Sequence, residues 1–339
     1  MANSYLQTLI KAVRSEFKNT TPQLPTAITA FKQAITDKLK VLSAGNNLRI
    51  YDGQEGGVVR GPKRDRQTCE NAESGNLLCQ EKYFTDCILE VPYFRSVFNL
   101  PAHTFALNTT PDLTVRLIGY ESPLMRKKTD RMNGEISSRA ISCDLVGLTS
   151  DNRILCIEGK VKPHNPATDI VYGLLESFAY GVCVEYFLAE ENYHASFCKE
   201  VGGCLSEFHP NACGFNEDKL TAAFTLAAPR EYFAEYFNPT QNQKKTARAH
   251  RNLIKKVESQ LSEAKQILAA FKENEGPAWA GFLIMERPCS VESFNAGSRR
   301  TVKEKTYVEP HFKSEPFKVE LAVDICTLNQ KVVNKGNSI

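Results

Sequence analysis

The sequence predicts an α/β fold with a central mixed β-sheet flanked by helices. Two observations carry this prediction. Residues 141–149 and 153–161 are rich in β-branched and apolar residues, and the polar stretch SDN between them indicates a β-hairpin. Strand-like and helix-like patterns then alternate, which is typical of helices layered on a sheet. The expected elements are a helix, a strand, a helix and a strand over 166–188, 220–229, 240–274 and 280–287.

The two ends of the chain add further elements to this layer. Residues 4–44 have the pattern of two amphipathic helices, interrupted at NTTPQLP by two prolines. A loop rich in glycine and charge follows at 52–67, and we predict a domain boundary there, between an N-terminal helical region (1–65) and a second domain (66–339). A short helix and a strand are expected between 75 and 100, and a further strand over 317–325.

Composition limits the classes of partner and location. The chain has 42 lysines and arginines against 39 aspartates and glutamates, so its net charge of +3 does not by itself indicate a polyanionic partner. The first helical segment carries Lys11, Arg14 and Glu16 and so lacks the apolar core of a signal peptide. No run approaches about 18 consecutive apolar residues, the length of a membrane span. We therefore expect a cytoplasmic protein whose eleven cysteines are mostly small buried hydrophobes.

The predicted hairpin places charged residues beside apolar runs. Side chains at i and i+2 of a strand share a face, so Glu158 and Lys160 project together, and the partner strand can bring Asp144 beside Glu158. Two neighbouring carboxylates repel each other unless a cation lies between them, and hard oxygen ligands suit Mg²⁺. Lys160 would add an ammonium next to an anion held by the metal. Metal, water and phosphodiester together would form a hydrolysis site.

This arrangement resembles the PD-(D/E)xK nuclease superfamily over roughly residues 135–287. The matching features are Asp144, thirteen intervening residues, the triplet Glu158-Gly159-Lys160, and the helix and strand that follow. The resemblance implies a restriction-endonuclease-like core and a metal-dependent endonuclease or exonuclease, with DNA favoured over RNA as substrate. It also implies that Asp144 and Glu158 hold Mg²⁺, for which Mn²⁺ can substitute, and that Lys160 positions the attacking water and stabilises the pentavalent phosphorus. Cys143 stands where the motif has its proline.

Further residues are candidates for the same site. Many relatives use an additional upstream glutamate, and both Glu81 and Glu135 compete for that role. On the helix after the hairpin, four residues lie along one side at helical spacing, where relatives often keep a polar residue facing the site: Asp169, Tyr172, Glu176 and Tyr180. For Asp169, a place in a solvated stripe is an equally good interpretation.

A second group of residues contains metal-ligand types. The segment 194–213 has the repeated spacing HxxxC and could hold a structural Zn²⁺ through His194, Cys198, Cys204, His209 and Cys213. No CxxC pair is present, however, and spacing alone is weak evidence. A cysteine-containing loop without metal is therefore the favoured interpretation.

Local basic clusters indicate a nucleic-acid partner. The cluster nearest to the hairpin contains Arg126, Lys127, Lys128 and Arg131, and others lie at 60–66, 244–256 and 298–305. Such densities of positive charge neutralise phosphates and make binding depend on salt, although a solvated helix face has the same composition. Cutting both strands of a duplex with one site per chain would favour a homodimer. The competing interpretations are a catalytically silent nuclease-fold module that binds nucleic acid or a protein partner, and a zinc-stabilised interaction protein.

Overall fold

The computed structural model of the chain describes residues 5–16, 24–48, 104–107, 113–125, 141–160, 169–212, 214–239, 247–285, 298–302, 305–309 and 319–333. Its N-terminal part consists of two helices, α1 (Tyr5–Glu16) and α2 (Leu24–Ala44), which confirms the expected helical region. The predicted loop at 52–67 and the predicted elements between 75 and 100 lie outside the described residues.

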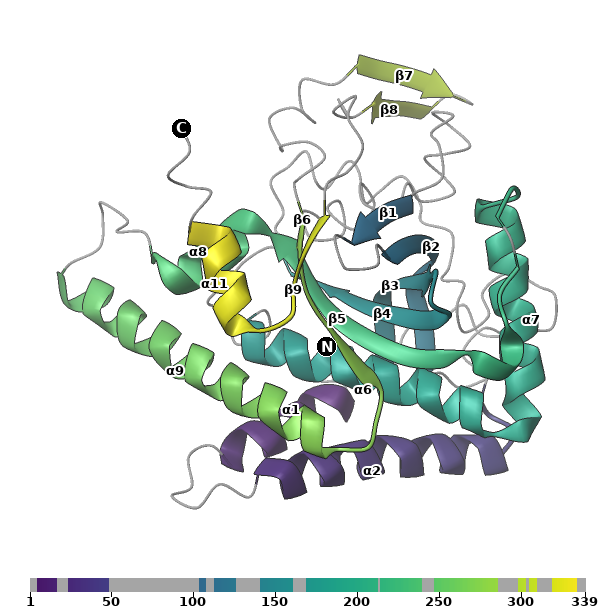
Figure 1. The fold of residues 1–339 in the computed structure, drawn as a ribbon, viewed down its shortest axis with the longest axis horizontal. Helices are drawn as coiled ribbons and strands as arrows, with labels where there is room; N and C mark the ends of the chain where they lie inside the picture. The colour runs from purple at the N-terminus through teal and green to yellow at the C-terminus, as the bar shows by residue number, and fades with distance from the viewer. Residues whose placement is uncertain are drawn as a thin grey trace.

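Seven strands of the described residues form one mixed sheet with the order β1-β2-β3-β4-β5-β6-β9 (Figure 1). The first four strands pair antiparallel, β4 to β6 pair parallel, and β9 returns antiparallel to β6. The edge strands β1 and β9 approach each other, so the sheet is nearly closed. The strands are β1 (Thr104–Leu107), β2 (Leu113–Met125), β3 (Ile141–Thr149), β4 (Arg153–Gly159), β5 (Thr221–Pro229), β6 (Ala278–Met285) and β9 (Val319–Ala322). The strands β7 (Ser298–Val302) and β8 (Lys305–Glu309) form a separate hairpin.

The hairpin expected from the sequence is the pair β3 and β4. Its turn is closed by Thr149, whose hydroxyl accepts a hydrogen bond from the Arg153 N–H at 2.8 Å. Asn152 adopts a positive φ of 71°, a conformation that asparagine tolerates better than most residues. Parallel pairing of β4 with β5 requires a crossover, and this is supplied by two helices, α6 (Ile170–Ala189) and α7 (Glu191–Phe208).

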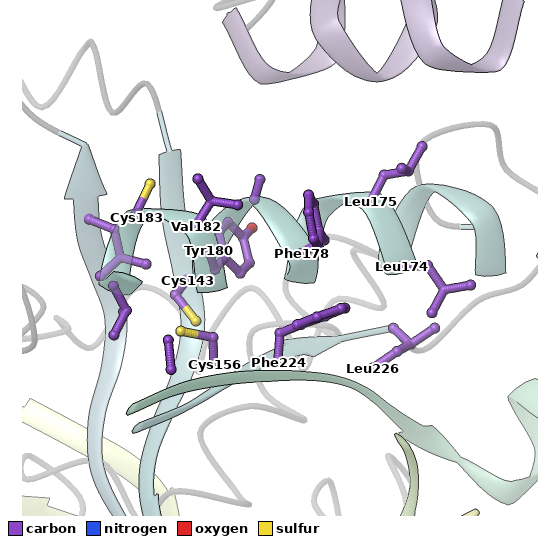
Figure 2. Packing of buried hydrophobic residues seen from close by; sticks show 14 of the residues in the cluster. Cys143, Cys156, Leu174, Leu175, Phe178, Tyr180, Val182, Cys183, Phe224 and Leu226 are labelled. Carbon is purple, nitrogen blue, oxygen red and sulfur yellow. The ribbon is translucent and has the colours of Figure 1, made fainter. Parts of the chain in front are cut away.

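Helix α6 is the centre of the hydrophobic core. It lies between the sheet on one side and α1, α2 and α9 (Ala247–Glu273) on the other (Figure 1). The Phe178 ring stacks on Phe31 of α2 and on Phe271 of α9, and meets Phe224 of β5 edge to face. Figure 2 shows Leu174 and Phe178 of α6 directly above Leu226 and Phe224 of β5. One core thus joins the N-terminal helices to the sheet.

Helix α6 is also apolar enough and long enough, by composition, to cross a membrane. Among the described helices it alone has this length and composition, and most of it is buried inside the protein. Burial of this kind is typical of a core helix with apolar residues on all sides.

The remaining described helices include three that the sequence did not predict, two short ones and α7. The predicted segments 240–274 and 317–325 correspond to α9 and β9. Two short helices follow β5 and β9, namely α8 (Arg230–Phe237) and α11 (Ile325–Val333). The prediction of a loop around the histidines and cysteines of 194–213 is wrong for most of that segment. Residues 191–208 instead form the helix α7. Its buried apolar residues Tyr193, Phe197, Val201, Leu205 and Phe208 recur at helical spacing.

Candidate functional site

The β3–β4 hairpin brings the two predicted carboxylates together. Leu145 pairs with Ile157, and one further step along this antiparallel register sets Asp144 opposite Glu158. The Asp144 Oδ2 atom accepts a hydrogen bond from the Gly159 N–H at 2.9 Å, which holds its carboxylate across the end of β4. The placement of Asp144 beside the Glu158-Gly159-Lys160 triplet is therefore as the sequence predicted.

Lys160 follows the last residue of β4 and points to the same side as Glu158. Its backbone N–H donates to the Ala227 carbonyl at 2.9 Å and so continues the parallel pairing with β5. Its Nζ atom forms an ion pair with Glu158 Oε1 and a second ion pair with Glu176 Oε2 at 3.0 Å. The ammonium also lies 5.5 Å from the centroid of the Tyr172 ring, within the range of a cation–π interaction.

Helix α6 therefore supplies two of the residues that the sequence grouped on one side of it. Tyr172 and Glu176 are one turn apart and both reach Lys160. Tyr180, one turn further on, is buried, and burial together with the carboxylates of Glu158 and Glu176 raises the pKa of its hydroxyl. The residues grouped by helical spacing thus include two, Tyr172 and Glu176, that contact Lys160.

Glu158 is the electrostatically unusual member of the site. Its side chain is 4% exposed, and its Oε2 atom is buried without a hydrogen-bond partner. Burial raises the pKa of this carboxyl well above its usual value, and the neighbouring Asp144 and Glu176 carboxylates raise it further. The Lys160 ammonium acts in the opposite direction but does not cancel these effects. Glu158 thus favours either a proton or a second cation.

The close approach of α6 to the sheet depends on a glycine. A Cβ atom at Gly173 would lie 2.7 Å from Leu226 Cδ1 and 3.4 Å from Lys160 Cγ. Because no side chain is present there, the helix can lie directly on the Lys160 stem and on β5. This contact sets the depth at which Glu176 meets the lysine.

Cys143, which stands where the motif has its proline, is a buried free thiol. Its Sγ atom donates to the Leu145 carbonyl at 2.9 Å, and Figure 2 shows it beside Cys156 below Tyr180. Burial, and then the adjacent Cys156, raise the pKa of this thiol well above its usual value. Cys143 is therefore a neutral core residue next to Asp144.

Asp169 has a structural role that differs from the solvated stripe considered above. It is 1% exposed and caps the N-terminus of α6, where its Oδ1 atom accepts a hydrogen bond from the Tyr172 N–H at 2.8 Å. Its Oδ2 atom accepts from Arg14 of α1 at 2.8 Å and from Gln260 of α9 at 2.9 Å. The solvated interpretation of Asp169 is wrong, because this one carboxylate joins three helices in the interior.

We expect Asp169→Ala to lower the free energy of unfolding by about 3 kcal/mol, since it removes a helix cap, leaves the buried Gln260 amide without this acceptor and takes one of two carboxylates from Arg14. Urea unfolding followed by circular dichroism measures this change. The matched control is Asp324→Ala, which removes an exposed cap that accepts from the Thr327 N–H at 2.7 Å at the start of α11. The control is expected to lose about 1 kcal/mol. Equal losses in the two variants would contradict the buried role of Asp169.

The histidines and cysteines of the second group are not brought together. His194 and Cys198 lie one turn apart on α7, with Nε2 and Sγ 3.8 Å from each other, whereas His209 Nε2 lies 2.7 Å from the Leu117 carbonyl of β2. Burial raises the pKa of the Cys198 thiol to about 11, which disfavours the thiolate that a metal requires. In the part of the chain that the structure describes, no group of three or more His, Cys, Asp or Glu residues could hold a metal ion.

Several predicted site residues lie outside the described residues. These are the two upstream glutamates, one cysteine of the second group, and the basic cluster before the hairpin: Glu81, Glu135, Cys213, Arg126, Lys127, Lys128 and Arg131. Their roles stay predictions from the sequence.

Comparison of the chain with models of known protein families, with curated proteins and with solved structures found no match. No relative therefore supplies an activity or a set of site residues. The function has to be argued from the Asp144, Glu158, Lys160 and Glu176 cluster itself.

Proposed function

We propose that this protein is a metal-dependent nuclease that hydrolyses phosphodiester bonds, with DNA as its substrate. The observation that carries the proposal is the buried Glu158 carboxylate, which has a raised pKa and one unpartnered oxygen, beside Asp144 and Lys160. Strained titratable groups of this kind concentrate at functional sites. The order of hairpin, crossover helix and parallel strand supports the assignment of β2 to β5 and α6 to a PD-(D/E)xK core.

The donor set of the site fits a small divalent cation. Mg²⁺ is commonly held by one or two carboxylates, with water and substrate phosphate as its other ligands. Asp144 and Glu158 provide such a pair, and a cation there would satisfy the unpartnered Glu158 oxygen. When bound, Mg²⁺ or Mn²⁺ would lower the pKa of a coordinated water and neutralise charge on the phosphate.

The residues of the chain would then perform three tasks. Asp144, fixed by the Gly159 N–H, and Glu158 would form the anionic side of the site. Lys160 would place its ammonium near the phosphorus and stabilise negative charge that develops there. Glu176 gives Lys160 a second carboxylate at 3.0 Å, so the ammonium keeps its position when Glu158 binds a cation.

One observation favours the alternative, a catalytically silent nuclease-fold module that binds nucleic acid or a protein partner. The side chains of Glu158 and Lys160 are only 4% and 6% exposed and are paired with each other. A buried ion pair of this kind can also have a purely structural role. The two functions differ in whether phosphodiester bonds are cleaved.

The deciding experiment is a cleavage assay on plasmid, linear duplex, single-stranded DNA and RNA, with Mg²⁺, Mn²⁺ or EDTA. We expect cleavage of DNA with either metal and none in EDTA. Asp144→Asn should abolish both cleavage and the heat of Mn²⁺ binding in calorimetry, while the amide oxygen can still accept from the Gly159 N–H. Cleavage by this variant at the wild-type rate, or no cleavage of any substrate by the wild type, would leave the silent module in its place.

Location and assembly belong to the same proposal. A cytoplasmic protein would meet the nucleic acid directly, and a homodimer would provide one site for each strand of a duplex. Sedimentation of the protein with and without a short duplex would test the dimer, which predicts two chains on each DNA.

A further inference from the structure

The N-terminal half of α9 carries an exposed face of one charge. Arg248, Arg251 and Lys255 are exposed and follow one another at intervals of three and four residues, which places them on one side of the helix. We call these three residues the basic face. Figure 1 shows α9 along the edge of the molecule, with its N-terminal end at the left margin.

The charge of α9 is divided between its two halves. Residues 247–257 contain four lysines and arginines and no acid, whereas the remainder contains charges of both signs, namely Glu258, Glu263, Lys265, Lys272 and Glu273. Within the described residues, the basic face forms no ion pair with a neighbouring carboxylate. An ordinary solvated helix face has charges of both signs interspersed, as the second half of α9 does.

The positive charges of the basic face destabilise the N-terminal end of α9. The first turn of α9 begins at Ala247, contains no acidic residue and has Arg248 as its second residue. Because the N-terminus of a helix carries partial positive charge, cations there are repelled, and acids are the residues that stabilise this end. A bound anion would remove this repulsion.

The same helix is attached to the candidate site. Gln260 of α9 donates to Asp169 at 2.9 Å, and Asp169 caps the helix that brings Tyr172 and Glu176 to Lys160. Gln260 is buried and faces the core, whereas the basic face lies on the solvent side of the same helix. At about 1.5 Å per residue the basic face extends for roughly 10 Å, the rise of about three nucleotides in one DNA strand.

We infer that Arg248, Arg251 and Lys255 bind the phosphate backbone of DNA. This inference rests on the proposed nuclease function and names a surface on which the substrate lies. The contacts are with phosphates, so they give affinity and dependence on salt but no choice of sequence.

The test measures binding of a fluorescein-labelled DNA duplex, and of one of its single strands, in EDTA so that no cleavage occurs. The variant is Arg248→Gln/Arg251→Gln/Lys255→Gln. A control with the same change in charge is Lys40→Gln/Lys265→Gln/Lys272→Gln, in which all three lysines are exposed and lie outside the basic face. Circular dichroism and thermal unfolding check the fold, and the first variant is expected to be no less stable than the wild type, because it removes cations from a helix N-terminus.

We expect the basic-face variant to bind the duplex on the order of tenfold more weakly at low salt. The slope of log K against log salt should fall by roughly 0.9 for each lost phosphate contact. The control should bind within about twofold of the wild type. Equal weakening by both variants, unchanged binding by the first, or no DNA binding by the wild type would each overturn the inference.

The outcomes separate this surface from the nuclease proposal. In one outcome, the basic-face variant loses binding while the wild type shows no cleavage in Mg²⁺. That result would support the DNA-binding surface and reject the nuclease function. Cleavage by the wild type, combined with unchanged binding and cleavage by the variant, would keep the nuclease and reject the surface.

Discussion

Lys160→Met is expected to lower the free energy of unfolding by about 3–5 kcal/mol at pH 8, because it leaves buried carboxylates without their cation. The lysine contacts Glu158 and Glu176, and its side chain is 6% exposed, so water cannot replace it. In the nuclease proposal, the same change should lower the cleavage rate by about 10²–10³, the usual effect of losing one charged donor at a transition state.

The loss of stability should depend on pH in a defined direction. Burial already raises the pKa of Glu158, and Lys160 is the group that opposes this rise. Without the lysine, Glu158 takes up a proton more readily, so stability should be regained as the pH falls through its folded pKa. Urea unfolding at pH 8 and pH 6 measures the difference.

A matched control is Lys331→Met, which removes a lysine that is 36% exposed and lies 3.9 Å from Glu320. An exposed pair contributes about 0–1 kcal/mol, and we expect a loss in that range at both pH values. The buried role of Lys160 would be contradicted if the two variants lost equal stability, or if the loss in Lys160→Met were the same at pH 6 and pH 8.

Glu158→Gln should have the opposite effect on stability and the same effect on cleavage. The raised pKa of Glu158 means that its neutral form suits the folded protein better than its charged form. A neutral amide of the same shape keeps an acceptor for Lys160 and removes the repulsion by Asp144. We expect the variant to be more stable than the wild type at pH 8 in EDTA, because Lys160 keeps Glu176 as its charged partner, and to be inactive as a nuclease.

The stability difference between Glu158→Gln and the wild type should depend on pH. Between the unfolded pKa and the raised folded pKa of Glu158, the folded protein binds more protons than the unfolded chain. The stability of the wild type therefore falls as the pH rises through this interval and is constant above it. Glu158→Gln lacks this fall, so its advantage should grow from acid to neutral pH. Unfolding at a series of pH values from about 4.5 to 9 tests it, and a wild type whose curve runs parallel to that of the variant would refute the prediction.

A second acid on the same hairpin should behave in the opposite way. Partial burial raises the pKa of Asp151. Hydrogen bonds from Arg153 and Thr149 together outweigh this effect and hold the pKa below its usual value. Its charged form therefore stabilises the folded state, and that contribution is lost as the pH falls through the folded pKa. Asp151→Asn should be less stable than the wild type at pH 8, and the difference should disappear in acid.

The elements with strong local patterns could be predicted from the sequence. The hairpin was visible because apolar and β-branched residues fill both strands around a short polar turn, and α9 because its charged and apolar residues alternate over seven turns. The proximity of Asp144, Glu158 and Lys160 could be predicted from two local rules. Residues at i and i+2 of a strand share a face, and the hairpin register sets Asp144 opposite Glu158. These are relations over fewer than twenty residues, which single-sequence patterns record well.

Relations between distant segments could not be predicted in this way. Asp169 is linked to Arg14 and Gln260, which are 155 and 91 residues away, and no local pattern distinguishes a buried cap from a solvated acid. The contact of Glu176 with Lys160 depends on how deeply α6 lies on the sheet, which the missing side chain of Gly173 decides. Helix α7 was not predicted, because its cysteines and histidines also fit a loop with metal ligands, although its apolar residues recur at helical spacing.

The extent of burial of α6 has a consequence for the order in which the chain is made. This helix would be poorly soluble alone, since apolar residues surround it and its length matches a membrane span. Its partners are β5 and α9, which are synthesised after it, and α1 and α2, which are synthesised before it. As the nascent chain lengthens, the two N-terminal helices and the β3–β4 hairpin are already available to cover two of its sides. Because α1 and α2 precede α6 in the chain, they can cover this apolar segment before β5 and α9 have been synthesised.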